Sequence, residues 1–203
     1  MKGLIIAIEG INGSGKSTII TELTKYFRNI RQPYKVYKFP DRQGYYGTQI
    51  DKFLRKEQNF EYKYDMFNAF AANRLAVRNQ MLRDMHNGFI VICDRYIFSG
   101  IAYHIPLDAS PQSIQNYQNI IGYFDKDMPI PDMTYLISGN HLHLRKEDKQ
   151  RFHGVNTNKL FNIFKQIITH ETSNYMILRN EYGKIDELVQ FMVNDIYLKS
   201  IKK

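Results

Sequence analysis

The chain has 203 residues, of which 43% are hydrophobic and 24% charged, and its formal net charge at pH 7 is +8. This balance predicts one globular α/β domain over residues 1–203, and no apolar run approaches the ~20 residues that a membrane span requires. Cys93 is the only cysteine, so an internal disulfide is excluded and a reducing compartment is favoured. Because Met1 leads almost directly into the first apolar run, without room for a signal peptide, we expect a cytoplasmic protein, or one in the host cytoplasm if its source is a virus.

The excess of positive charge has two interpretations. It favours either binding to nucleic acid or a polyphosphate site around which the cations gather. Several arginines are expected beside the phosphate site described below, and the sequence lacks a basic stripe with interleaved aromatic residues. We therefore expect small-molecule nucleotides as ligands, with neither nucleic acid nor membrane as a partner.

The first predicted strand and the turn after it carry a specific motif. Residues 4–8 form a short apolar run, as in a parallel strand buried on both faces. Residues 10–18 read GINGSGKST, which fits G-x-x-x-x-G-K-[ST], and apolar residues then recur at helical spacing as far as Ile30. An ordinary glycine-rich turn is the alternative, but strand, motif and helix together predict a nucleoside triphosphate site.

The residue types of this turn suit phosphate binding. Its glycines let successive N–H groups point at a phosphate, and the first turn of the following helix adds its dipole. Lys16 can reach the outer phosphates, and the Ser17 hydroxyl can ligate a magnesium ion. The predicted nucleotide-binding residues of the turn are Asn12, Gly13, Ser14, Gly15, Lys16, Ser17 and Thr18.

The remaining elements alternate between strands and helices. Apolar runs predict strands at residues 36–39, 89–93, 133–137 and 175–178, and helical spacing predicts helices at 47–55, 62–86, 110–122, 156–168 and 185–196. This order predicts a three-layer P-loop NTPase fold with a five-stranded parallel sheet flanked by helices, and the polar segment 140–154 as a short lid. Ligands of such sheets bind at the carboxyl ends of the strands.

Three segments of the sequence together resemble the thymidylate kinase family. They are residues 39–42 (FPDR), 70–74 (FAANR) and 94–103 (DRYIFSGIAY), in the family's order and close to its spacing. The resemblance implies that the chain transfers the γ-phosphoryl group of ATP, with Mg²⁺, to thymidine 5′-monophosphate and so serves dTTP synthesis. It also implies a homodimer formed through helices, for which residues 62–86 are a candidate.

The resemblance implies that Arg42 and Arg95 hold the phosphate of the acceptor and that Arg95 also bridges it to the donor. A guanidinium matches a phosphate bidentately, which suits that role. Asp94 is placed like an acid that acts through magnesium, so Ser17 and Asp94 form the expected metal site. The alternatives are that Asp94 merely orients Arg95, and that Arg42 is an ordinary surface residue.

The base and sugar of the acceptor are expected to meet a second group of residues. Phe70 and Arg74 share one helix face, which by resemblance lets the ring stack on a pyrimidine while the guanidinium reaches a base carbonyl. Alternatively, Phe70 belongs to the core. Tyr103 is expected beside the deoxyribose, where it would disfavour a 2′-hydroxyl, and Ser99 and Gly100 are expected to shape the floor of the base pocket.

Two positions depart from the family pattern. Asn12 replaces a carboxylate that many members place near the 3′-hydroxyl of the acceptor, which opens the question of relaxed selectivity for the sugar. Gly13 is an arginine in some branches; where it is not basic, the lid supplies the catalytic charge, so Arg145 and Arg151 are the candidates. Arg179, after the last strand, is expected to pack near the donor adenine. The predicted catalytic residues are Lys16, Asp94, Arg95, Arg145 and Arg151.

Two other functions compete with this interpretation. A deoxynucleoside kinase would need a base to activate a 5′-hydroxyl and would have no use for Arg42 as a phosphate clamp. A P-loop NTPase that binds nucleic acid would use the net charge of +8 on a polyanion.

Overall fold

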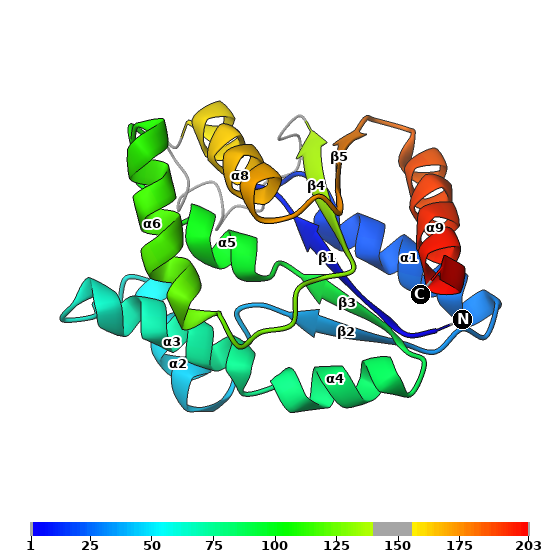
Figure 1. The fold of residues 1–203 in the computed structure, drawn as a ribbon, viewed down its shortest axis with the longest axis horizontal. Helices are drawn as coiled ribbons and strands as arrows, with labels where there is room; N and C mark the ends of the chain where they lie inside the picture. Colours follow the sequence, from blue (N-terminus) through cyan, green and yellow to red (C-terminus); the bar gives the residue numbers. More distant parts are fainter. Residues whose placement is uncertain (1, 140–155, 203) are drawn as a thin grey trace.

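The computed structural model describes residues 2–139 and 156–202, which form a five-stranded sheet in the order β2-β3-β1-β4-β5 (Figure 1). Every pair of neighbouring strands is parallel. The strands are β1 (Leu4–Glu9), β2 (Tyr34–Lys38), β3 (Ile90–Asp94), β4 (Met133–Gly139) and β5 (Tyr175–Asn180). The predicted alternation of strands and helices, and the pairing of the first strand with the third, are confirmed.

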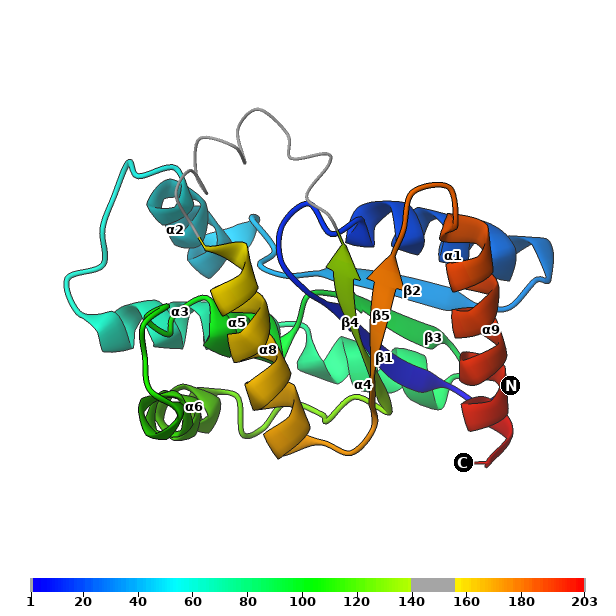
Figure 2. The same ribbon diagram turned by 90° about the horizontal axis from the view of Figure 1, so that it is seen from above.

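Helices cover both faces of the sheet (Figure 2). They are α1 (Lys16–Asn29), α2 (Gly44–Leu54), α3 (Lys63–Leu75), α4 (Arg78–His86), α5 (Ile97–Ala102), α6 (Pro111–Phe124), α8 (Thr157–Glu171) and α9 (Ile185–Lys202). None of the helices within these described ranges combines the length and the apolar character that crossing a membrane demands.

The central strand shows why its sequence is continuously apolar. Successive side chains of a strand point to opposite faces. Ile6 therefore packs in the cluster that includes residues of α1 and α9, whereas Ile5 packs with Met81 of α4 on the other face. Both isoleucines are at most 1% exposed, so truncating either to alanine removes about 2–5 kcal/mol of stability.

The segment predicted as one helix at residues 62–86 is two helices, α3 and α4. The N–H of Val77 donates to the carbonyl of Arg74 at 3.2 Å, a contact three residues back that tightens the turn between them. The two halves also pack against different partners. The end of α3 contacts Asp125 after α6, whereas Met81 of α4 packs against the sheet. Periodicity alone did not reveal this break, because both halves carry apolar residues at helical spacing.

Helix α5 was not predicted. Its six residues are too few for a helical period to stand out in the sequence. By contrast, α6 begins as predicted: Ser110 is its N-cap, with Oγ accepting from the Ser113 N–H at 3.2 Å, and Pro111 is its first residue.

Candidate active site

A cavity of about 930 Å³ opens at the carboxyl ends of the strands. It is lined by the turn after β1, the loops after β2, β3 and β5, and parts of α2, α3 and α5. Most of the predicted site residues line it together: Asn12, Gly13, Gly15, Lys16, Ser17, Thr18, Arg42, Phe70, Arg74, Asp94, Arg95, Ser99, Gly100 and Tyr103. One continuous space thus joins the phosphate turn to the predicted base pocket.

The phosphate turn has the backbone that its glycines predict. Gly15 precedes α1 with a φ of 91°, and a Cβ added there would lie 2.0 Å from Nδ2 of Asn180. That amide donates to the carbonyl of Ser14 at 3.0 Å, so the end of β5 holds the turn. Gly15 has no side chain to cap α1, and N–H groups at the start of a helix can bind an anion. Lys16 is 6% exposed, and its Nζ donates to the carbonyl of Ile11 at 2.7 Å.

Arg95 lies across the phosphate turn. Its Nη1 donates to the carbonyl of Gly10 at 2.8 Å and to Oγ of Ser99 at 3.2 Å, and its Nη2 donates to Oδ1 of Asn12. The same Asn12 oxygen accepts from the Tyr103 hydroxyl at 3.0 Å, and the guanidinium lies 5.1 Å from the centre of the Tyr103 ring. The loop after β3 therefore places its cation directly on the turn after β1.

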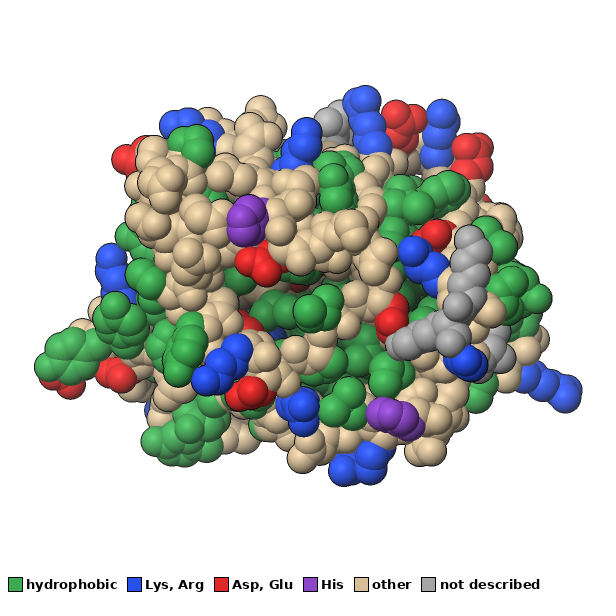
Figure 3. Space-filling model, viewed as in Figure 1, with side chains coloured by type: hydrophobic (Ala, Val, Ile, Leu, Met, Phe, Trp, Pro, Cys, Tyr) green, Lys and Arg blue, Asp and Glu red, His purple; other side chains and the backbone are tan. Residues whose placement is uncertain are grey.

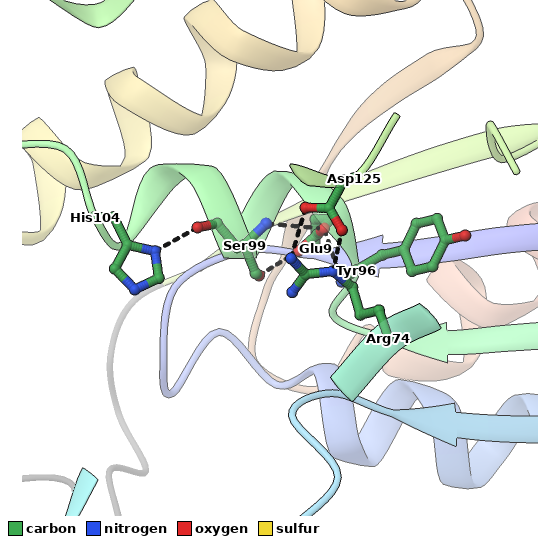
Figure 4. Close-up of polar contacts among 7 residues, drawn as sticks. Glu9, Arg74, Tyr96, Ser99, His104 and Asp125 are labelled. Atoms are coloured by element: carbon green, nitrogen blue, oxygen red, sulfur yellow. Dashed lines mark hydrogen bonds and ion pairs between the residues drawn. The ribbon is translucent and has the colours of Figure 1, made fainter. Parts of the chain in front are cut away.

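Glu9 supports this placement and was missed from the sequence. Its carboxylate accepts from the N–H groups of Tyr96 at 2.9 Å and Ser99 at 3.1 Å, and from the Ser99 hydroxyl (Figure 4). Glu9 thereby fixes the start of α5, next to Arg95, whose φ of 65° is unusual for a residue with a side chain. Burial raises the pKa of Glu9, although the Ser99 hydrogen bonds and the Arg95 charge act in the opposite direction. The sequence did contain one signal for Glu9, because this carboxylate ends a strand that is otherwise apolar.

Arg42 reaches the cavity from the loop after β2. Asn73 of α3 fixes this loop, because its Oδ1 accepts from the Asp41 N–H at 2.9 Å and its Nδ2 donates to the Asp41 carbonyl at 2.8 Å. The Arg42 side chain is 47% exposed and pairs with Asp51 of α2. The hydrogen bond from Arg42 lowers the pKa of Asp51. This guanidinium is therefore near the predicted phosphate position but is engaged by a surface carboxylate.

The other end of the cavity is aromatic. Phe70 is 9% exposed, and the centre of its ring lies 5.0 Å from that of His104 in an edge-on arrangement. Nδ1 of His104 contacts the carbonyl of Gly100, and burial lowers the pKa of His104 to about 4 (Figure 4). Phe70 thus packs in a small core cluster, as the alternative interpretation expects, and it also lines the cavity, so its stacking on a base stays a prediction. His104 was missed because its partners are distant in sequence or belong to the backbone.

Arg74 lines the same end of the cavity, yet its side chain is only 3% exposed. Its Nε and Nη2 donate to the two carboxylate oxygens of Asp125 at 2.7 and 2.6 Å (Figure 4). A Cβ added to Gly100 would lie 2.8–2.9 Å from the guanidinium, so glycine lets α5 approach this group. The sequence indicated the arginine but not its carboxylate partner.

Known proteins similar to this chain point to one family. The profile described as thymidylate kinase matches residues 8–187. The chain belongs to the thymidylate kinase family. The thymidylate kinase of Leptospira borgpetersenii serovar Hardjo-bovis is 29% identical over 210 residues, covering 100% of this chain and 97% of that protein. That of Dictyostelium discoideum is 35% identical over 103 residues, which are 50% of this chain and only 46% of that relative's length. The solved thymidylate kinase of Candida albicans, an enzyme of broad substrate specificity, matches with a TM-score of 0.77 at 25% identity, covering 98% of this chain and 94% of that chain.

The predicted fold and the predicted membership of the thymidylate kinase family are therefore confirmed. In the family's nucleotide chemistry a divalent cation accompanies the phosphates, and the residues present suit one. Ser17 and Asp94 offer oxygen ligands to the same cavity, and magnesium is commonly held by one or two carboxylates together with substrate phosphates. Asp94 is 7% exposed, and its carboxylate lies 3.9 Å from Nζ of Lys38. Among the described residues, no cluster of three or more His, Cys, Asp or Glu side chains offers another metal site.

Two predicted site residues, Arg179 and Ser14, are not among those that line this cavity. The Arg179 side chain is 71% exposed and pairs with Glu181 at 3.6 Å, and residues 180–183 line the cavity in its neighbourhood. Ser14 is 1% exposed, and its Oγ accepts from Nζ of Lys16 at 3.4 Å. Arg145 and Arg151, with the whole predicted lid at 140–154, lie outside the described residues.

Proposed function

We propose that this chain transfers the γ-phosphoryl group of ATP to thymidine 5′-monophosphate, giving the diphosphate. The observation that carries the proposal is a single cavity with a phosphate-binding turn at one end and the Phe70 and Arg74 pocket at the other. Arg42 and Arg95 line the same cavity, and the two phosphate chains would meet beside them. Family membership supports the same assignment.

Catalysis in this arrangement depends on positioning and on neutralising charge. Lys16 and the N–H groups at the start of α1 hold the donor phosphates. Arg95 contacts the phosphate turn and reaches the acceptor phosphate, so it keeps the two reacting groups aligned as negative charge spreads over the transferred group. Ser17 and Asp94 would hold a magnesium ion, which would supply further charge neutralisation. No covalent intermediate with the protein is needed.

The test is a coupled ATPase assay in which purified protein receives thymidine 5′-monophosphate or thymidine. We expect rapid turnover with the monophosphate and none with the nucleoside. Turnover with thymidine alone would assign the chain as a deoxynucleoside kinase. Salt-dependent DNA binding without either activity would favour a nucleic-acid-binding NTPase.

We also propose relaxed selectivity at the 3′ position of the acceptor. Oδ1 of Asn12 accepts from Arg95 and from Tyr103, and an amide brings no negative charge toward a 3′ substituent. Thymidine 5′-monophosphate and its 3′-deoxy-3′-fluoro analogue should therefore differ less in kcat/KM for this chain than for Asn12→Asp. An equal ratio in the two proteins would contradict the proposal.

The catalytic arginine of the lid stays a prediction. Gly13 cannot supply positive charge, and an arginine placed on the transferring group contributes about 10³- to 10⁵-fold in rate. Arg145→Ala and Arg151→Ala should be measured separately for turnover. If turnover falls less than tenfold in both variants, neither arginine is catalytic.

A homodimer through α3 and α6 is proposed from their exposed aromatic residues. Tyr64 and Tyr123 are 60% and 64% exposed, and both pack against Phe124. Apolar side chains gather at this end of the molecule in the space-filling view (Figure 3). Sedimentation should give a dimer for the unmodified chain and a monomer for Tyr64→Glu.

A cytoplasmic location stays a prediction.

A further inference from the structure

The ion pair between Arg74 and Asp125 joins two segments 51 residues apart. The two side chains are 3% and 2% exposed, and the guanidinium donates to both oxygens of the carboxylate. Buried pairs of this kind contribute little net stability compared with apolar residues of the same volume. Stability therefore does not explain why a carboxylate stands at position 125.

Local helix structure does not explain Asp125 either. The residue follows the last residue of α6, and a carboxylate there meets the negative end of the helix dipole. Its own N–H closes the last turn by donating to the carbonyl of Gly122 at 3.0 Å, a bond that needs no acidic side chain. The neighbouring Asp127 is exposed, so its position differs from that of Asp125 although both follow the same helix.

The pair fixes the orientation of the Arg74 guanidinium (Figure 4). Nε and Nη2 are occupied by Asp125, and the guanidinium packs against Gly100 of α5. Within the described part of the chain, Nη1 makes no hydrogen bond, and Arg74 lines the base end of the cavity. An N–H group held there can donate to a carbonyl oxygen but cannot accept from an amino group.

We propose that Asp125 is a positioning residue that sets base selectivity through Arg74. It holds the guanidinium so that Nη1 presents a donor to the base, which favours pyrimidines with a carbonyl at position 4 over those with an amino group. This inference rests on the proposed function, because it assumes that the acceptor base lies beside Phe70 and Arg74. Asp125 itself does not line the cavity.

The test compares kcat/KM for thymidine 5′-monophosphate with that for deoxycytidine 5′-monophosphate in the unmodified chain, Asp125→Asn and Asp127→Asn. The amide introduced by Asp125→Asn presents an N–H group to the guanidinium and loosens it. We expect the KM for thymidine 5′-monophosphate to rise about tenfold and the preference over deoxycytidine 5′-monophosphate to fall about tenfold, as for one charge-assisted hydrogen bond. The KM for ATP should not change, and Asp127→Asn should match the unmodified chain.

A double-mutant cycle covers the case in which Asp125→Asn folds poorly because it leaves a buried charge unpaired. In an Arg74→Gln background, Asp125→Asn should change neither the KM for the acceptor nor the selectivity, because the positioned group is already absent. A purely structural role for Asp125 is indicated if the second substitution lowers activity further or raises the KM for ATP as much as that for the acceptor. Unchanged selectivity in folded Asp125→Asn would overturn the inference while the proposed function stands. An unmodified chain that phosphorylates neither monophosphate would instead refute the proposed function.

Discussion

Two arginines of the same cavity stand in opposite environments. Arg74 is 3% exposed and is held by both oxygens of Asp125, whereas Arg42 is 47% exposed and shares Asp51 with Arg55. Removing one partner of a buried pair costs about 3–5 kcal/mol, whereas an exposed pair contributes only about 0–1 kcal/mol. Arg42 can therefore leave its carboxylate for an incoming phosphate at little cost, whereas Arg74 stays in place and offers the N–H groups of Nη1.

The difference indicates that the base end of the cavity is formed before the acceptor arrives, whereas the phosphate end is completed by it. A preformed base pocket suits selection, because a fixed donor discriminates between carbonyl and amino groups. An exposed arginine suits the binding of a hydrated, highly charged phosphate group.

Among the substitutions at the phosphate end, replacing Arg95 should have the largest effect, because this residue joins the phosphate turn to the acceptor side. Replacing it with alanine removes the hydrogen bonds to Gly10, Asn12 and Ser99 and leaves the charge of the transferred group unmet. We expect kcat/KM for thymidine 5′-monophosphate to fall by about 10³, the upper end for removing one stabilising donor. Steady-state kinetics measure it, with the exposed Arg83→Ala as the control. A loss of less than tenfold would remove Arg95 from the catalytic group.

Arg42 and Arg55 provide a matched pair, because both contact Asp51. Arg42 lines the cavity, and Arg55 is not among its lining residues. Arg42→Ala should raise the KM for thymidine 5′-monophosphate roughly 10- to 100-fold, the value of a charged hydrogen bond to phosphate, with the KM for ATP unchanged. Arg55→Ala should leave both constants as they are. Equal effects from the two substitutions would mean that Arg42 acts only by organising Asp51.

The sequence predicted best what depends on neighbours along the chain. The phosphate turn, its flanking strand and helix, and the start of α6 are local patterns, and all three are confirmed. The pairing of the first strand with the third followed from their continuous apolar character, which indicates burial on both faces. These features need no knowledge of which distant side chains meet.

The missed features depend on contacts between distant segments. Glu9 supports residues that come 87 and 90 positions later, and Asp125 holds a residue 51 positions earlier. Nothing in the residues around Asp125 distinguishes it from the exposed Asp127. The turn between α3 and α4 is likewise set by what each helix packs against.

Gly100 tests the rigidity of the base end. Its substitution by alanine would place a Cβ 2.8 Å from Nη1 and Nη2 of Arg74, and the guanidinium cannot swing away while Asp125 holds it. We expect roughly a tenfold loss in kcat/KM for the acceptor, equivalent to about 1.4 kcal/mol. Gly122→Ala in α6 is the control, because its Cβ would meet only Cδ1 of Ile101 at 3.9 Å. Wild-type kinetics in Gly100→Ala would show that Arg74 is free to move.

His104 gives the smallest expected effect and concerns the stability of the same end. Burial lowers its pKa from 6.5 to about 4 in the folded chain, so between these values the unfolded chain binds more protons. Stability should therefore fall as the pH drops from about 6.5 to about 4 and should level off below that. Glu9 contributes with the opposite sign, because burial raises its pKa and the folded chain holds its proton to higher pH.

Comparing the unmodified chain with a variant that lacks His104 separates the contribution of His104 to the pH dependence of stability from that of Glu9. Urea unfolding of the unmodified chain and of His104→Gln, measured from pH 7.5 to pH 4, cancels the contribution of Glu9. Glutamine cannot titrate, so the free energy of unfolding of His104→Gln should fall less over this range than that of the unmodified chain. Parallel curves for His104→Gln and the unmodified chain would show that the imidazole is as easily protonated in the folded state as in the unfolded one. The imidazole would then be solvated before the acceptor binds, and His104 would no longer support a preformed base end.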